Sequence, residues 1–211
     1  EKIKERFENS FAFDKMHLTV KLAARICCIQ NTRQINSMND LFNIIDYSME
    51  KNKKNKETCI IEVSPEVLDK QKREFNISLA LSNAIARKSF QVYYQPVYNA
   101  KNNRFIGLEA LVRLKDSNLG MISPEEFIPL AEKDGSIIAI GEIVLEKVCK
   151  FVEQYHPEDF GIKSVNINLS TIQCMQENSI YKLTSITNDY RIPKGFINFE
   201  ITEQTTENIL Q

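Results

Sequence analysis

The chain has 211 residues, 43% of them hydrophobic and 26% charged, which is enough for one large domain or two modest ones with apolar cores. Its 27 Lys and Arg nearly balance its 28 Asp and Glu, and a net charge of −1 argues against a nucleic-acid polymer as partner. The five cysteines lack metal-ligand spacing and are interpreted as reduced thiols of a cytoplasmic protein. No apolar run approaches the roughly 20 residues of a membrane span, so we expect no membrane contact from this segment, and any tether would lie outside it.

Residues 1–62 are predicted to form the end of a small α/β domain. After a polar helix, residues 18–22 alternate between apolar and polar as in a strand, and residues 26–29 are a short apolar run. From Ser37, with Asp40 as its capping partner, apolar residues recur at helical spacing. The apolar face of this helix needs a sheet to cover.

Residues 63–77 are predicted to be a linker helix, because Ser64 and Pro65 make a helix start and residues 70–74 carry alternating charge. A second helix follows, with an apolar set formed by Leu79, Leu81, Ala84 and Ile85. We therefore place the second domain at residues 78–211.

Short strands separated by helices make up this second domain. Strands are expected at residues 90–97, 105–114, 164–169 and 196–202. Helices are expected at residues 123–135, 137–155 and 171–188. Strands that alternate with helices predict an α/β fold with a mainly parallel sheet and helices outside it, either doubly wound or closed into a barrel.

Polar side chains recur at alternate positions in three of these strands, so each strand presents them on one face. The polar residues are Glu109 and Arg113 in the first strand, Asn166 and Asn168 in the second, and Asn198 and Glu200 in the third. The apolar Leu111 lies on the same face as Glu109 and Arg113. A buried carboxylate or amide is costly unless something pairs with it. Three strands of this design indicate a shared charge partner.

An oxygen-binding cation is the simplest shared partner. Glu109, Asn168 and Glu200 offer only oxygen ligands, which suit Mg²⁺ or Mn²⁺ better than zinc. Arg113, two residues beyond Glu109 on the same face, would grip an anion bound to that metal, and a metal beside an arginine is typical of phosphate-ester chemistry. The alternative is that each polar group bonds to backbone or pairs with a neighbouring Lys or Arg, and the pattern alone leaves both open.

Five segments resemble the successive motifs of the EAL domain family, in order and at the expected separations. They are residues 90–97 (FQVYYQPV), 107–113 (GLEALVR), 122–132 (ISPEEFIPLAE), 165–170 (VNINLS) and 199–203 (FEITE). A lone Glu-Ala-Leu tripeptide would carry no weight, whereas five ordered motifs make a specific match.

The resemblance implies an incomplete modified TIM-type (β/α) barrel, with the substrate and two divalent cations, Mg²⁺ or Mn²⁺, at the C-terminal rim of the strands. It carries the family's metal ligands onto Glu109, Asn168 and Glu200. It carries the substrate contacts onto Gln95, Leu111 and Arg113, while Glu203 is expected only to support the rim. The implied partner is cyclic di-GMP, which the family hydrolyses to linear pGpG.

Residues 1–62 resemble, more weakly, the C-terminal part of a GGDEF-like domain, the diguanylate cyclase fold that often precedes an EAL domain. The resemblance rests on residues 18–20 and the helix that follows Ser37. Residues 23–28 read AARICC where the family usually has a sequence near SIGIA. This difference predicts a degenerate, non-cyclising relative.

The family's later motifs, with paired aspartates, a lysine, a further glutamate and the general-base region, are expected beyond Gln211. The 211-residue chain is therefore predicted not to hydrolyse cyclic di-GMP itself. The parent protein is interpreted as a phosphodiesterase, and the alternative is an inactive module that binds cyclic di-GMP or another protein. Four strands cannot close a barrel, so we expect a second copy, in a homodimer, or the N-terminal segment to cover the open edge.

Overall fold

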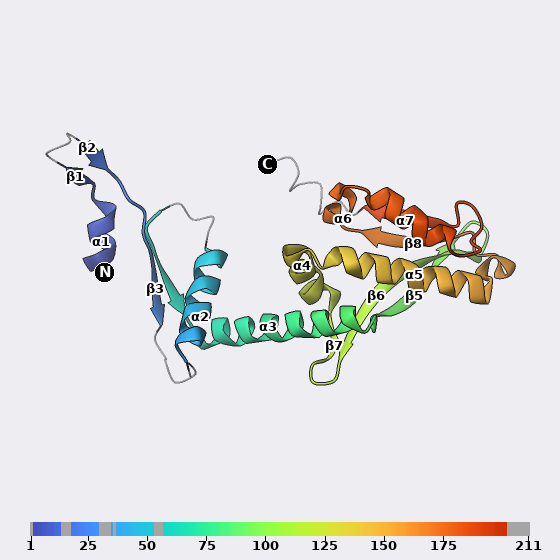
Figure 1. The fold of residues 1–211 in the computed structure, drawn as a ribbon, viewed down its shortest axis with the longest axis horizontal. Helices are drawn as coiled ribbons and strands as arrows, with labels where there is room; N and C mark the ends of the chain where they lie inside the picture. The colour runs from blue at the N-terminus through green and yellow to red at the C-terminus, as the bar shows by residue number, and fades with distance from the viewer. Residues whose placement is uncertain (1, 14–17, 30–34, 36, 53–56, 202–211) are drawn as a thin grey trace. The chain divides into compact units, whose positions relative to one another are not determined.

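The computed structural model describes residues 2–13, 18–29, 35, 37–52 and 57–201. The chain divides into two compact units, unit 1 at residues 1–75 and unit 2 at residues 76–211. Helix α3 (Pro65–Ala86) starts in unit 1 and ends in unit 2 (Figure 1). The predicted linker helix and the helix after it are thus one helix, because no Gly or Pro interrupts residues 66–86. No described helix is both long and apolar enough to cross a bilayer.

In the part of unit 1 that the structure describes, the strands form two separate two-stranded sheets. Its elements before α3 are α1 (Lys2–Glu8), β1 (Phe11–Phe13), β2 (Leu18–Val20), β3 (Arg25–Ile29), α2 (Met38–Lys51) and β4 (Cys59–Val63). β1 pairs antiparallel with β2, and β3 pairs in parallel with β4. The strands expected around residues 18–22 and 26–29 are therefore present but belong to different sheets.

Strand β4 was absent from the sequence prediction, although three of its five residues, Ile60, Ile61 and Val63, are β-branched. It makes a parallel β3-α2-β4 unit. Helix α2 begins where its capping pair predicts, because the Ser37 Oγ accepts a hydrogen bond from the Asp40 N–H at 3.1 Å. The apolar face of α2 packs through Ile44 against Val63 and Leu68, so it covers the parallel strand pair.

Unit 2 is a mixed α/β structure built on one sheet. Its strands are β5 (Gln91–Asn99), β6 (Arg104–Asp116), β7 (Gly120–Ile122), β8 (Ser164–Leu169) and β9 (Ile197–Ile201). The strand order is β5-β6-β8-β9, with β7 added to the end of β6. β5 and β7 each pair antiparallel with β6, whereas β6, β8 and β9 are parallel, so the sheet is mixed and not mainly parallel as predicted.

The helices of unit 2 follow their predicted bounds closely, with one exception. They are α4 (Pro124–Asp134), α5 (Ile137–Tyr155), the short 3-10 helix η2 (Pro157–Phe160), α6 (Thr171–Met175) and α7 (Ser179–Asn188). The single helix expected at residues 171–188 is two helices. Asn178 breaks it by adopting a left-handed φ of 64°, which asparagine tolerates better than most residues.

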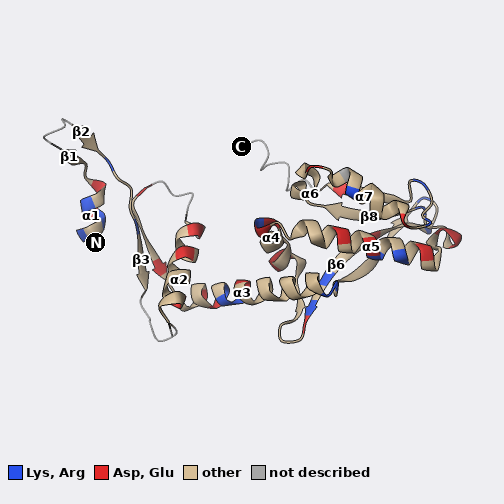
Figure 2. Ribbon diagram, in the orientation of Figure 1, with Lys and Arg blue, Asp and Glu red and all other residues tan. Residues whose placement is uncertain are grey.

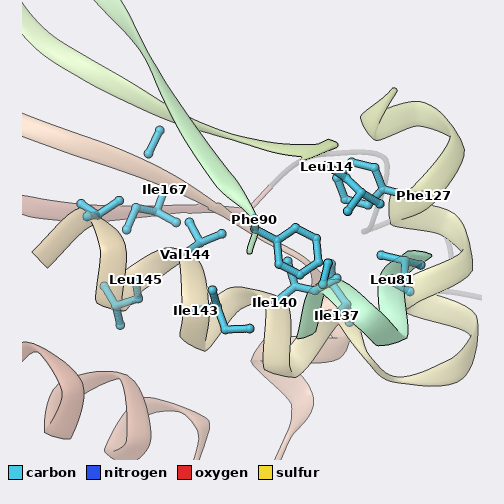
Figure 3. Packing of buried hydrophobic residues seen from close by; sticks show 14 of the residues in the cluster. Leu81, Phe90, Leu114, Phe127, Ile137, Ile140, Ile143, Val144, Leu145 and Ile167 are labelled. Carbon is cyan, nitrogen blue, oxygen red and sulfur yellow. The ribbon is translucent and has the colours of Figure 1, made fainter. Parts of the chain in front are cut away.

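Helix α5 provides the centre of the core of unit 2 (Figure 3). Its Leu145 and Val148 are fully buried and belong to the same apolar cluster as Val165 and Ile167 of β8. Phe127 of α4 is also fully buried in that cluster. One face of the sheet is therefore apolar and covered by helices, which leaves the opposite face for polar side chains.

Glu146, on α5, lies between two lysines. Its carboxylate oxygens lie 2.8 Å from Lys150 Nζ and 2.7 Å from Lys88 Nζ, and these hydrogen bonds lower the pKa of Glu146 from its usual 4.5 to about 2. The ionised carboxylate therefore stabilises the fold at pH values above the unfolded pKa, and this contribution is lost as the pH falls from there towards the folded pKa.

We expect Glu146→Gln to flatten the acid dependence of stability in this window, by a modest amount because both lysines are largely exposed. Urea denaturation of the two proteins across this pH range measures the difference. Glu142→Gln is the matched control, since Glu142 contacts Lys182 at a longer 3.4 Å. Equal acid dependence in wild type and Glu146→Gln would contradict the assignment.

Candidate functional site

The strands of unit 2 align their polar residues in rows on the sheet face opposite the core. The register pairs Gln95 with Glu109, Glu109 with Asn166, and Asn166 with Asn198. Two residues further along, Tyr93 pairs with Leu111, and Asn168 pairs with Glu200. The residues that strand alternation predicted to share a face do so. β8 carries no charged residue, so the charges of this face come from the neighbouring strands (Figure 2).

Amide groups of β8 contact both carboxylates of this face. The Asn168 Nδ2 donates a hydrogen bond to Glu109 Oε1 at 2.8 Å, and the Asn166 Nδ2 donates one to Glu200 Oε1. The Asn198 Nδ2 donates to Asn166 Oδ1 at 3.2 Å. Among the described residues, neither carboxylate forms an ion pair with a Lys or Arg.

The donor set of Glu109, Asn168 and Glu200 suits an oxygen-binding divalent cation. The 2.8 Å between Glu109 Oε1 and the Asn168 amide is close to the roughly 3 Å expected between adjacent octahedral ligands placed about 2.1 Å from Mg²⁺. A flip of this amide turns Oδ1 towards Glu109. In the described part of the chain, His, Cys, Asp and Glu side chains form no group of three suited to a metal, so the fit depends on the asparagine.

A cavity of about 290 Å³ lies at the C-terminal end of β8 and along the C-terminal half of β6. Leu111, Arg113 and Asn168 line it from the strands, and α4, α5 and the start of α6 contribute the remaining walls. The structure thus brings these three predicted site residues to one cavity. The other three, Gln95, Glu109 and Glu200, lie along the polar sheet face.

Arg113 is held at this rim by two contacts. Its guanidinium carbon lies 5.4 Å from the centroid of the Tyr93 ring, within the range of a cation–π interaction. Its Nη1 donates a hydrogen bond to the Val112 carbonyl at 2.9 Å. Both contacts leave part of the guanidinium fork available for an anion.

Sequence reasoning assigned no role to Asn166, Asn198 or Tyr93, although alternation placed the two asparagines on the polar face. Which amide meets which carboxylate depends on the register between strands that are more than 25 residues apart in the chain. Tyr93 lies two residues from Gln95 in β5 and therefore on the same face of the strand. This spacing could have indicated that Tyr93 is near Arg113. Glu203 lies outside the described residues.

The fold and the site together define an α/β domain in which carboxylate, amide and guanidinium side chains gather on one face of the sheet. A family model of the EAL domain matches residues 78–210, well over half of the chain. The chain belongs to the EAL domain family.

Similar proteins include the signaling protein YkoW of Bacillus subtilis, 32% identical over 138 residues, which cover 65% of this chain and 17% of YkoW. The bifunctional diguanylate cyclase/cyclic di-GMP phosphodiesterase MucR of Pseudomonas aeruginosa is 31% identical over 59% of this chain and 18% of MucR. The solved structure of PaMucR phosphodiesterase with c-di-GMP superposes with a TM-score of 0.57 at 30% identity, covering 61% of this chain and 52% of that one. The chain spans less than a fifth of these two curated relatives.

Proposed function

We propose that the protein acts in cyclic di-GMP signalling, and that it belongs to a metal-dependent phosphodiesterase that hydrolyses cyclic di-GMP to linear pGpG. The observation that carries this proposal is the hydrogen-bonded pair of Glu109 and Asn168 beside Glu200 on one sheet face, with Arg113 at the adjoining cavity. The EAL family match and the resemblance to a phosphodiesterase solved with c-di-GMP support it.

In this proposal Glu109, Asn168 and Glu200 hold Mg²⁺ or Mn²⁺, which would supply Lewis acidity towards the phosphodiester. Arg113 binds a phosphate oxygen through its guanidinium fork, and the Tyr93 ring keeps that side chain in place. Leu111 packs against the bound nucleotide from the cavity wall. Gln95, opposite Glu109 in the register, provides a neutral hydrogen-bonding group to the same ligand.

Finer features of the architecture belong to the same proposal. The sheet of β5, β6, β8 and β9 is the first part of a TIM-type (β/α) barrel, which agrees with its parallel strands and its one helix-covered face. Residues 1–62 are the C-terminal part of a degenerate GGDEF-like domain, and the parallel β3-α2-β4 unit agrees with such an α/β fold.

Homodimer formation through the open sheet is also part of the proposal. Phe199 and Ile201 of β9 are 39% and 57% exposed, although they share the face that is apolar in β8. An exposed apolar edge strand favours pairing with another chain. Sedimentation analysis of the chain tests this, with a dimer expected and a monomer at all concentrations contradicting it.

The alternative is a module that binds cyclic di-GMP or another protein without hydrolysing the nucleotide. Assays of pGpG release, run beside binding measurements, distinguish the two functions.

The test is equilibrium binding of cyclic di-GMP to the 211-residue chain, measured by calorimetry with Mn²⁺, with Mg²⁺ and with EDTA. We expect cation-dependent binding that prefers cyclic di-GMP over GMP and linear pGpG. Arg113→Ala should weaken it by about 10- to 100-fold, since a hydrogen bond to a charged group contributes about 1.5–3 kcal/mol. The affinity of Arg113→Lys should lie between those of the wild type and Arg113→Ala, because lysine keeps the positive charge but lacks the guanidinium fork. Equal affinity for GMP, or binding unaffected by Arg113→Ala, would contradict the proposal.

A further inference from the structure

We propose that Gln173 is a positioning residue of the candidate site: seated against Gly141 of α5, it fixes Ser170 and thereby the end of β8 that carries Asn168. This inference rests on the proposed function, because Asn168 is one of the proposed cation ligands. Gln173 belongs to α6 and its side chain is hydrogen-bonded to the Ser170 backbone, so its effect on Asn168 would pass through the backbone.

Gly141 makes room for the Gln173 side chain. It lies inside α5, where glycine destabilises a helix relative to alanine. A Cβ at this position would lie 1.8 Å from Gln173 Nε2 and 3.1 Å from Gln173 Cδ. Any other residue at position 141 would therefore force the amide end of Gln173 to move, and the close approach accounts for a glycine within this helix.

Gln173 is 6% exposed, although glutamine is usually a surface residue. Its Oε1 accepts a hydrogen bond from the Ser170 N–H at 2.9 Å, and the Ser170 Oγ accepts one from the Ile172 N–H at 3.2 Å. Together they form a capping box at the start of α6. Because α6 has five residues and cannot be stable alone, these contacts decide where it begins.

The capping box is directly joined to the candidate ligands. Ser170 follows Leu169, the last residue of β8, and Asn168 stands one residue earlier with its amide on Glu109 at 2.8 Å. Gly141, Asn168, Ser170 and Gln173 all line the same cavity. Contacts thus run from α5 through Gln173 and Ser170 to the end of β8. Groups that orient metal ligands in this way typically change metal affinity by about 10- to 100-fold when they are mutated.

Three substitutions at position 173 separate hydrogen bonding from packing. Gln173→Glu keeps the acceptor for the Ser170 N–H, Gln173→Met keeps most of the volume without it, and Gln173→Ala loses both. Mn²⁺ and cyclic di-GMP affinities are measured by calorimetry on the 211-residue chain, together with thermal unfolding. We expect Gln173→Glu to bind within about threefold of wild type. Gln173→Met and Gln173→Ala should bind about tenfold more weakly or worse.

Substitutions of Gly141 provide a second arm. Gly141→Ala should displace Gln173, lowering both the unfolding temperature and the two affinities. In the double variant with Gln173→Ala, the new methyl group occupies vacated space, so the unfolding temperature should recover in part while both affinities stay low. Recovery of binding together with stability, or wild-type binding by Gln173→Met, would show that Gln173 only fills space and would overturn the inference.

Ser37→Ala is the matched control, since it removes a capping hydrogen bond from α2 in unit 1. It should leave both affinities unchanged. The side-chain amide resonance of Asn168 in the cation-free chain separates this inference from the proposed function. Gln173→Met should shift that resonance and Gln173→Glu should not, whether or not the wild type binds cyclic di-GMP. An Asn168 resonance that is the same in all three proteins would overturn the positioning role.

Discussion

Replacing Phe127 with alanine is expected to lower the free energy of unfolding of unit 2 by about 3–5 kcal/mol. Phe127 is 0% exposed, and its ring centroid lies 6.3 Å from that of Phe90, so both rings belong to the same buried cluster. Truncation loses the transfer free energy of the ring and leaves a cavity between α4 and the rest of the core. Urea denaturation, with hydrogen exchange of the β8 amides as the probe, reports on unit 2 separately from unit 1.

Phe160→Ala is the control for this measurement, because Phe160 is 82% exposed and its loss should change the free energy by less than about 0.5 kcal/mol. Phe127→Ala should also weaken the binding of cyclic di-GMP. Helix α4 contributes Pro124, Ile128 and Glu132 to the cavity wall, so a displaced α4 changes the shape of the cavity. A Phe127→Ala protein as stable as Phe160→Ala would show that the core is not packed as described.

Glu109→Ala is expected to weaken Mn²⁺ binding, and the cyclic di-GMP binding that depends on it, by about 100-fold, the upper end of what supporting contacts to a metal contribute. The change removes the anionic oxygens of a proposed cation ligand and also leaves the Asn168 Nδ2 without the acceptor that it has at 2.8 Å. Glu109→Ala thus removes a negative charge and a hydrogen bond at one position of the sheet. Calorimetric titration with Mn²⁺ measures the effect.

Glu109→Gln separates charge from shape, since it retains an oxygen acceptor for Asn168 but removes the negative charge. It should therefore keep the fold of the site and still lose most of the cation affinity. Asp159→Ala is the matched control, because Asp159 is an exposed carboxylate in η2, which precedes β8, whereas Asn168 lies near the other end of that strand. Equal Mn²⁺ affinity in wild type, Glu109→Ala and Asp159→Ala would exclude Glu109 as a ligand.

The sequence pattern was a good guide wherever one element carried its own signal. Helix α5 has the predicted bounds because its apolar spacing is continuous up to His156 and Pro157, which end it. Strand β8 has the predicted bounds because Val165, Ile167 and Leu169 alternate with polar residues. In both elements the periodicity of the apolar residues matches the side chains that are buried, so the local sequence is sufficient to predict them.

Predictions were less successful where an element depends on a distant partner. Strand β4 is short, and its place is fixed by pairing with β3, more than 30 residues earlier. The break between α6 and α7 depends on the left-handed Asn178, which lies inside one apparently helical segment. Alternation predicted the polar face of the site, whereas the pairing of Asn166 with Glu200 required the register. The burial of Gln173 against Gly141 had no signal in the local pattern.

The rows of polar residues across β6, β8 and β9 also set how the domain tolerates insertions and deletions. One residue inserted before Asn166 in β8 would reverse which face each side chain of the strand points to. Asn166 and Asn168 would then point into the helix-covered core, and the buried Val165 and Ile167 would point outwards. Two inserted residues would restore the parity but move both asparagines by about 6.6 Å along the strand, away from Glu109. Length changes are therefore excluded from this strand, whereas the exposed turn at residues 193–195, ahead of the buried Phe196, can absorb them without changing which side chains face each other.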